Sequence, residues 1–422
     1  MEIKEQILAM GAKALAASRA LSTLPSESKD SILLVMADCL EASGADILAA
    51  NSLDISAAKQ NGLTSAMIDR LHLDQKRLSA IANGIRQVAA LPNPVGEVIS
   101  QWQRPNGIDI EQIRVPIGVI GIIFESRPNV TSDAAVLCLK AGNATILRGG
   151  SEAINSNRAI ASALQAGGEG AGLPANSIQL IPFTDRESVR HLAEMDQFLD
   201  LIIPRGGAGL IETVVSLARM PVIKHYDGIC HVYVDSEANL DMATAITVDA
   251  KTQKPGVCNA METLLVHSDI AGDFLPEAAV ALQERNVELR CDGKAREILG
   301  ESVKQAVESD WRTEYLDLIL SVKVVDALAD AIAHINEYGS HHSDCIVTSK
   351  EPRAERFLAE VDSATVFWNT STRFSDGEEF GFGAEIGIST DKLHARGPMA
   401  LRELTSYKYL VRGDGQTKGG AS

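Results

Sequence analysis

From residue 115 onward, short apolar runs alternate with helix-like segments, and this alternation constrains the fold more than any other feature of the sequence. Strands are expected at 115–124, 144–147, 178–181, 199–203 and 222–224, with helices at 131–140 and 186–193 and two more that end near 166 and 218. Alternating strands and helices are typical of a parallel sheet. The pattern therefore predicts an open α/β unit of the kind that binds nucleotides.

A second series of the same kind follows. Strands are expected at 232–234, 264–267, 287–289, 318–325, 345–348 and 365–368, and helices at 241–250, 272–284, 327–338 and 353–359. Residues 370–400 are rich in glycine and charge, and a loop of that length is usually functional. At 422 residues the chain is too long for one hydrophobic core, so two or three domains are expected.

The first 115 residues have a different character. Residues 1–91 carry apolar residues at helical spacing, which predicts a helical segment closed by Pro92 and Pro94. Asn106-Gly107 between two strand-like runs indicates a β-hairpin over 96–115. Because two strands alone are marginal, we expect a third strand, 407–411, to pair with them in the same or another subunit.

Charge and cysteine content exclude several classes of protein. A net charge of −17 argues against nucleic acid or an anionic membrane as the main partner. None of the six cysteines forms a C-x-x-C pair, and the spacing of His225, His231, His341 and His342 matches no zinc pattern, so no metal is expected. The charged N-terminus lacks the apolar region of a signal peptide, which predicts a cytoplasmic protein with reduced thiols.

Two glycine-rich turns lie between an expected strand and an expected helix. They are Arg148-Gly149-Gly150-Ser151 and Arg205-Gly206-Gly207-Ala208-Gly209. Small residues at a helix N-terminus suit a phosphate, because unpaired N–H groups and the helix dipole favour an anion there. Neither turn is the G-x-G-x-x-G fingerprint, and such a turn is often only a turn. Two of them with arginine in one sheet nevertheless favour a nucleotide site.

Two further stretches carry chemistry. Glu125-Ser126-Arg127-Pro128-Asn129 follows a buried strand, where ligands bind in open α/β sheets, so Arg127 could hold an anion and Asn129 could donate to an oxyanion. Cys258 follows the turn Pro255-Gly256 and precedes the apolar run 264–266. A lone cysteine is more often a small buried hydrophobe than a nucleophile, and local sequence alone leaves both readings open.

Taken together, these motifs resemble the aldehyde dehydrogenase superfamily, in particular its branch that reduces γ-glutamyl phosphate. The resemblance covers nearly the whole chain and rests on the stretches 116–121, 124–129, 140–143 and 254–259. It implies a Rossmann-like cofactor domain, an α/β catalytic domain and a β-hairpin flap for oligomerisation, with the active-site cleft between the first two. The implied boundaries are 1–95 and 116–228 for the cofactor domain, 96–115 with 404–412 for the flap, 229–370 for the catalytic domain, 371–403 for a segment returning near the active site, and 413–422 for a disordered tail.

The resemblance also assigns residues. Cys258 matches the superfamily's thiol nucleophile, and Asn129 is the candidate for the oxyanion donor. The positions implied for the nicotinamide cofactor are Arg148, Ser151, Gly206, Gly207 and Glu314, with Arg148 favouring NADP over NAD. Arg127 and Arg373 are candidates for the substrate's phosphate or α-carboxylate.

One departure from the superfamily bears on the reaction. Members that hydrolyse a thioester carry a glutamate where this chain reads Lys224-His225-Tyr226-Asp227-Gly228. An enzyme that receives an acyl group from an acyl phosphate needs no activated water, which would waste its intermediate. The resemblance thus implies NADPH-dependent reduction of γ-glutamyl phosphate to glutamate 5-semialdehyde, the second step of proline biosynthesis from glutamate.

Alternatives remain at this level. Another acylating or oxidising aldehyde dehydrogenase, or a catalytically silent relative that acts as a scaffold, would share the fold. The chain has no kinase segment, so the acyl phosphate must come from a separate glutamate kinase, with which a transient complex is expected. The hairpin and the strand at 407–411 predict at least a homodimer by strand exchange.

Overall fold

The computed structural model describes residues 2–224 and 226–418, and the chain divides into two compact units. The first comprises residues up to Lys224 together with 382–387 and the segment from Met399 onward; the second comprises Tyr226–Gly381 and Ile388–Pro398. Among the described residues, no helix is both long and apolar enough to cross a membrane.

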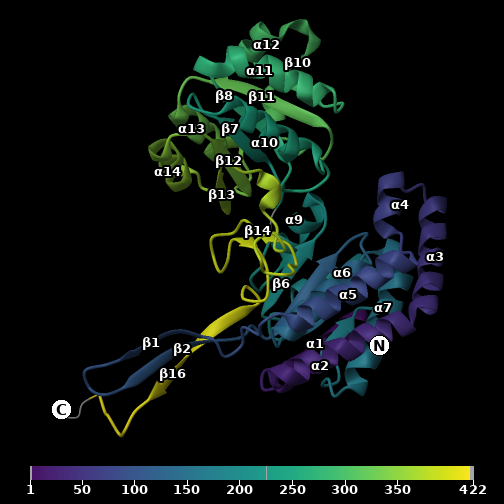
Figure 1. Ribbon diagram of the computed structural model, residues 1–422. Coiled ribbons are helices and arrows are strands. Elements are labelled where there is room, and N and C mark those ends of the chain that lie inside the picture. Colours follow the sequence, from purple (N-terminus) through teal and green to yellow (C-terminus); the bar gives the residue numbers. More distant parts are fainter. Residues whose placement is uncertain (1, 225, 419–422) are drawn as a thin grey trace. The chain divides into compact units, whose positions relative to one another are not determined.

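The first unit is built around a four-stranded parallel sheet with the order β5-β4-β3-β6. Its strands are β3 (Val119–Phe124), β4 (Ala144–Gly149), β5 (Ile178–Leu180) and β6 (Leu201–Arg205). Its helices are α1 (Ile3–Leu21), α2 (Ser26–Ala42), α3 (Gly44–Gln60), α4 (Ser65–Leu71), α5 (Gln75–Ala90), α6 (Asn129–Lys140), α7 (Ile154–Gly170), α8 (Arg186–Ala193) and α9 (Ala208–Leu217). The expected helical segment and parallel sheet are therefore both present (Figure 1).

The start of this sheet differs from the expected strand over 115–124. Residues 115 and 116 belong to the preceding strand, and β3 begins only at Val119. The break falls at Gly118, whose φ is +136° and where a Cβ atom would lie 2.2 Å from Asp200 Oδ2. That carboxylate oxygen accepts a hydrogen bond of 2.8 Å from the Val119 amide. Only glycine fits this bend, so the apolar run is divided into two strands.

A separate antiparallel sheet joins residues from opposite ends of the sequence. β1 (Val98–Gln103), β2 (Asp109–Pro116) and β16 (Thr405–Arg412) lie side by side in the order β1-β2-β16 (Figure 1). The hairpin at Asn106-Gly107 and its pairing with the C-terminal strand within the same chain are confirmed. Residues 413–418 contain no helix or strand, and Gln416 Nε2 donates to the Asn106 carbonyl at 3.0 Å; residues 419–422 of the expected tail lie outside the described part of the chain.

The second unit contains a seven-stranded parallel sheet with the order β10-β9-β11-β8-β7-β12-β13. Its strands are β7 (Cys230–Val234), β8 (Met261–His267), β9 (Glu288–Cys291), β10 (Lys304–Gln305), β11 (Ile319–Val325), β12 (Ser343–Val347) and β13 (Thr365–Trp368). Its helices are α10 (Leu240–Thr252), α11 (Ser268–Gln283), α12 (Gly293–Leu299), α13 (Leu328–Tyr338) and α14 (Glu351–Glu360), and a two-residue pair, β14 (Ile388–Ser389) and β15 (Gly397–Pro398), completes it.

Three features were not expected from the sequence. Residues 222–224 form only an isolated bridge from Val222 to Ile202 rather than a strand. Helix α12 was missed, because its seven residues are too few to show a helical period. The return segment 371–403 is shared by both units, since 382–387 and the residues from Met399 onward belong to the first.

The second unit also buries a histidine that is held neutral. His334 is 4% exposed and packs against the rings of Trp311 and Tyr338. Its Nδ1 lies 3.1 Å from Lys323 Nζ, which can only donate, so Nδ1 is the acceptor. Burial first, and then electrostatic interactions with His231, Lys323 and Arg312, lower the pKa of His334 to about 2.

This histidine predicts a pH dependence of stability. In the unfolded chain a histidine takes up a proton below about pH 6.5, whereas folded His334 does not until about pH 2. The stabilisation is therefore present above pH 6.5 and is lost as the pH falls, by up to about 1.4 kcal/mol per pH unit. His334→Asn should flatten the fall in the free energy of unfolding between pH 6.5 and 5, measured by urea denaturation. Equal slopes for the two proteins would contradict this account.

Candidate active site

The second unit presents Cys258 on a turn between α10 and β8. The helix ends at Thr252 and the strand begins at Met261, so the cysteine lies three residues before a buried strand. Cys258 is partly exposed, and so is Cys39 in the last turn of α2. Of these two partly exposed thiols, only Cys258 lies on a loop at the end of a sheet strand.

The other four cysteines are buried and poorly suited to nucleophilic chemistry. Burial raises the pKa of Cys138, Cys291 and Cys345 to about 12, and raises that of Cys230 well above its ordinary value. Because the thiolate is the reactive form, these groups stay inert at neutral pH. The structure therefore leaves Cys258 as the thiol of interest in the second unit.

The backbone around Cys258 packs tightly against Gly228. A Cβ atom at Gly228 would lie 1.9 Å from the Cys258 carbonyl oxygen, far inside van der Waals contact. Cys230 Sγ donates to the same oxygen at 3.2 Å. The turn is thus fixed from the side of residues 228–230, by a glycine that allows close approach and by a buried thiol.

Glu314 meets the same turn. Its Oε1 accepts a 2.8 Å hydrogen bond from the Gly228 amide, so one intervening residue connects it to Cys258. Burial is the largest cause that raises the pKa of Glu314 above its ordinary value, and the hydrogen bond from Gly228 opposes it. A carboxylate has several acceptor sites, so Glu314 can still accept from a ligand. The structure thus brings two of the predicted site residues, Cys258 and Glu314, together.

Arg373 lies on the opposite border of the turn. Asn259 Nδ2 donates to the carbonyls of Ser375 at 3.0 Å and Arg373 at 3.3 Å, and Arg373 Nε donates to Gln253 Oε1 at 3.0 Å. Both ends of the Cys258 turn are therefore tied to the segment that carries Arg373. The arginine keeps further N–H groups that can hold an anion.

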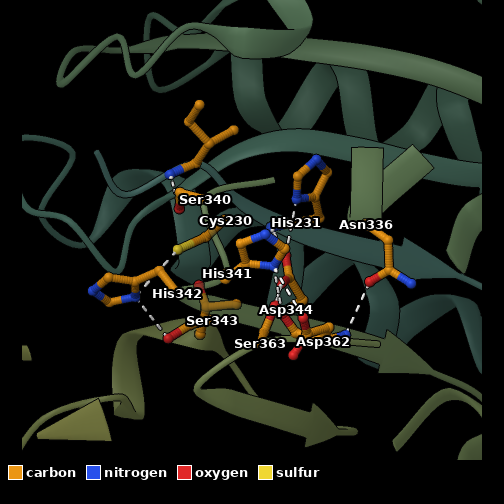
Figure 2. Close-up of polar contacts among 12 residues, drawn as sticks. Cys230, His231, Asn336, Ser340, His341, His342, Ser343, Asp344, Asp362 and Ser363 are labelled. Atoms are coloured by element: carbon orange, nitrogen blue, oxygen red, sulfur yellow. Dashed lines mark hydrogen bonds and ion pairs between the residues drawn. The ribbon is translucent and has the colours of Figure 1, made fainter. Parts of the chain in front are cut away.

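A cluster of polar side chains holds residues 229–231 in place (Figure 2). The amide and Nδ1 of His231 both lie 2.8 Å from Asp344 Oδ1, with both side chains fully buried. Ser340 Oγ accepts from the Ile229 amide at 2.8 Å, and Cys230 Sγ lies 3.7 Å from His342 Nδ1. These histidines from the sequence pattern thus contact protein groups of β12 and its neighbouring loop and anchor β7 there. His225, the remaining histidine of that pattern, lies outside the described residues.

The first unit collects its predicted residues at one edge of its sheet. The turns after β4, β3 and β6 all follow the carboxyl ends of adjacent parallel strands. The order β5-β4-β3-β6 reverses direction between β3 and β6, where open α/β sheets bind their ligands. Glu125, directly after β3, connects the turns after β3 and β6, because its Oε2 accepts a hydrogen bond from the Gly207 amide at 3.1 Å.

The glycines after β6 form a cradle at the start of α9. A Cβ atom at Gly206 would lie 2.4 Å from Glu125 Oε2 and 2.7 Å from a Leu210 methyl carbon, so a side chain there would have to displace these groups. The Gly207 amide already holds a carboxylate there, as expected of a helix N-terminus that favours anions. The sequence did not indicate Glu125 as the group that occupies this position.

Arg148, which the sequence predicts for the cofactor, donates to protein groups in this structure, and its cofactor role stays a prediction. Its guanidinium is buried and donates to Ser188 Oγ and to the carbonyls of Gly149 and Thr184. Burial lowers the pKa of this arginine from its ordinary value. Its donors thus hold the loop before α8, whereas Ser151 is exposed at the start of the short turn 151–153.

Ser126 and Glu152 connect two of the turns. Ser126 has a left-handed backbone, φ +47°, and both its amide and its hydroxyl donate to Glu152 Oε1 at 2.5 and 2.8 Å. A non-glycine residue in this conformation is held there by its surroundings. Glu152 therefore fixes the loop that leads from β3 to Arg127, which is exposed.

Asn129 begins α6 and faces a cavity of about 380 Å³. Its Nδ2 donates to Asp133 Oδ2 at 2.7 Å. Burial raises the pKa of Asp133 to about 6, against the lowering effects of Asn129 and Arg205. Arg70, His72 and Arg77 also line this cavity. The amide of Asn129 thus has a partner on its own helix, and its role as an oxyanion donor stays a prediction.

Known proteins resemble this chain over most of its length. Residues 2–297 match the model of the aldehyde dehydrogenase family. γ-Glutamyl phosphate reductase of Moorella thermoacetica is 54% identical over 418 residues, and that of Geotalea daltonii is 53% identical over 418 residues. In both cases the match covers 99% of this chain and 100% of the relative.

A solved structure matches as well. The crystal structure of γ-glutamyl phosphate reductase from Thermotoga maritima is 45% identical, covers 98% of this chain and 99% of its own, and superposes with a TM-score of 0.96. The chain belongs to the aldehyde dehydrogenase family and, within it, to the γ-glutamyl phosphate reductases. That membership makes it an oxidoreductase that uses a nicotinamide cofactor.

The contact at Gly228 gives a direct test of the site. In Gly228→Ala the new methyl group must displace the Cys258 carbonyl. A misplacement of about 1 Å can cost about a hundredfold in rate, so kcat/KM should fall by at least that factor. Gly272→Ala is the control, because Gly272 lies in α11 with nothing within 4 Å of its added Cβ. Equal activity of the two variants would contradict the assigned geometry.

Proposed function

We propose that the protein catalyses the NADPH-dependent reduction of γ-glutamyl phosphate to glutamate 5-semialdehyde with release of phosphate, the second step of proline biosynthesis from glutamate. The observation that carries this proposal is the geometry of the Cys258 turn: a partly exposed thiol fixed by Gly228 and bordered by Glu314. Relatives named for this reductase activity, similar over 99% of the chain, support the choice of substrate.

The chemistry at Cys258 follows from its setting. The thiolate attacks the acyl carbon of γ-glutamyl phosphate, the C–O bond to phosphate breaks, and a thioester forms on Cys258. When bound, NADPH supplies the hydride that reduces this thioester. Collapse of the resulting thiohemiacetal breaks the C–S bond, returns the thiol and releases the aldehyde.

The residues proposed for the nicotinamide cofactor carry suitable groups in each unit taken by itself. The α9 N-terminus already holds the carboxylate of Glu125 at Gly207, which supports an anion-binding role for Gly206 and Gly207. Glu314 retains acceptor capacity for a ribose hydroxyl. Ser151 is exposed and available for the adenosine ribose, whereas Arg148 acts by holding the loop before α8.

The engagement of the nearby glutamates favours a reductase of an activated acid over a hydrolytic aldehyde oxidiser. Two glutamates near the turn, Glu262 and Glu314, each hydrogen bond to protein groups. A carboxylate whose oxygens already accept from protein groups is not positioned to take a proton from water. Arg373 beside the turn and exposed Arg127 are proposed for the substrate's anionic groups, and a transient complex with glutamate kinase stays a prediction.

The thiol assignment is tested by substitution. Cys258→Ser should lower kcat by at least about a thousandfold, because a serine hydroxyl without a base is a weak nucleophile, while NADPH binding remains. The assay is phosphate-dependent oxidation of glutamate 5-semialdehyde, run with NADP and with NAD to establish coenzyme preference. Cys39→Ser is the control, since Cys39 is the other partly exposed thiol of the six.

Three outcomes would overturn the proposal. Unchanged turnover of Cys258→Ser would remove the covalent step. Oxidation of aldehydes by the wild-type protein at the same rate with and without phosphate would favour another aldehyde dehydrogenase. A wild-type protein that is inactive in both assays would point to a scaffold role.

We also propose that the β1-β2-β16 sheet joins two copies of the chain. β1 and β16 are its outer strands, and they expose apolar side chains: Val98, Ile99, Trp102, Tyr407, Tyr409 and Val411. Exposed edge strands with an apolar face are ready to pair with another chain.

Val411→Lys should therefore weaken self-association at least about tenfold, because a charge at the edge opposes strand pairing. Light scattering across a concentration series measures the effect. Val280→Lys on α11 is the matched control, as Val280 and Val411 are 57% and 60% exposed. A wild-type protein that stays monomeric at all concentrations would contradict this proposal.

A further inference from the structure

A fully buried ion pair closes the base of the Cys258 loop. Lys251, in the last turn of α10, and Glu262, the second residue of β8, have no exposed side-chain surface. Their Nζ and Oε2 atoms are 2.6 Å apart. The two residues flank the loop in sequence, so their contact joins its two ends.

Glu262 also reaches the segment that carries Glu314. Its Oε1 accepts a 3.1 Å hydrogen bond from the Leu316 amide, two residues after Glu314. Leu316 has a left-handed backbone, φ +53°, which a leucine adopts only when its surroundings impose it. The Glu262 carboxylate is one group that fixes this backbone.

The segment 314–316 packs on the loop at further points. A Cβ atom at Gly256 would be 3.7 Å from the Leu316 carbonyl oxygen, an ordinary contact distance. The Tyr315 ring lies 5.9 Å from Lys251 Nζ. Burial raises the pKa of Glu262 to about 7, while Lys251 and the Leu316 amide lower it. From its place in β8, Glu262 thus contacts both α10 and the Glu314 segment through a single carboxylate.

Stability alone is a weak reason for such a pair. A buried ion pair often contributes no more to folding than apolar residues of similar volume, because desolvation offsets the attraction. The particular property of Glu262 is that its second oxygen holds the Leu316 amide. An apolar residue could fill the same space but could not hold that amide.

We propose that Glu262, paired with Lys251, is a positioning residue that holds the backbone of Leu316 so that Glu314 presents its carboxylate to the cofactor ribose. This inference rests on the cofactor role of Glu314 in the proposed function. Glu262 itself touches neither substrate nor cofactor in this scheme. It acts through the 314–316 backbone.

Two double variants that differ only in the acceptor test the proposal. Lys251→Met/Glu262→Gln removes both charges and keeps an oxygen for the Leu316 amide, whereas Lys251→Met/Glu262→Met removes that oxygen at similar side-chain volume. The dissociation constant for NADPH, measured by calorimetry without substrate, should be about tenfold higher or more for the Met/Met variant. Equal dissociation constants would overturn the proposal.

A second comparison separates positioning from general loosening. In a Glu314→Ala background, the same change from Gln to Met at position 262 should leave the dissociation constant unchanged, because the group being positioned is gone. An equal rise in both backgrounds would show that Glu262 acts on folding and would overturn the inference. Melting temperatures of all variants accompany the binding data.

Glu262→Asp in the presence of Lys251 is the second variant, used if the double variants do not fold. It keeps the buried charges paired but retracts the carboxylate by one methylene, so it cannot reach both Lys251 and Leu316. NADPH binding should weaken, whereas Cys258 should still react with the acyl phosphate. Unaltered NADPH binding would count against the proposal. If the wild-type protein shows no phosphate-dependent activity, the proposed function is refuted, and the NADPH measurements can still be interpreted.

Discussion

The close approach of two backbones, at Gly228 and Cys258, is the constraint on which the rest of the second unit depends. Because a Cβ atom at Gly228 would overlap the Cys258 carbonyl, the two segments can meet only with glycine at this point. That contact leaves the Gly228 amide facing Glu314 and the Cys230 thiol facing the same carbonyl. The positions of the nucleophile and of a cofactor-binding carboxylate are thereby coupled through one residue without a side chain.

Buried charge supports this arrangement. The chain carries a net charge of −17, yet several of its cations lie inside: Lys251 with Glu262, and Lys140 with Asp30 and the Ala89 carbonyl. Buried charges are tolerated only with partners, and each pair fixes the two elements that supply it. In the first unit, Glu125 and Glu152 act similarly with backbone amides, since they join the turns after β3, β4 and β6. Carboxylates that accept hydrogen bonds from backbone amides thus fix the conformation of the loops at this edge of the sheet.

Much of the fold could be read from the residues, because parallel strands and amphipathic helices leave strong local patterns. The hairpin at Asn106-Gly107, the helix Arg186–Ala193 and the strand Thr365–Trp368 are present as expected. The errors fell where local pattern conflicts with tertiary contacts. Gly118 divides an apolar run because Asp200 occupies the space of its missing side chain, and residues 222–224 make only a single bridge. Helix α12 is too short to show a period.

The sequence by itself determined the succession of elements, the nucleophilic character expected of Cys258 and the resemblance that gives the chain its family. Only the tertiary structure decided which polar groups meet: that Arg148 is occupied by the loop before α8, and that Glu262 holds both Lys251 and Leu316. The physical reason is the separation in sequence between the residues that interact. Helix and strand periods arise between residues close in sequence, whereas these contacts join residues up to 54 positions apart and exist only after the sheets have assembled.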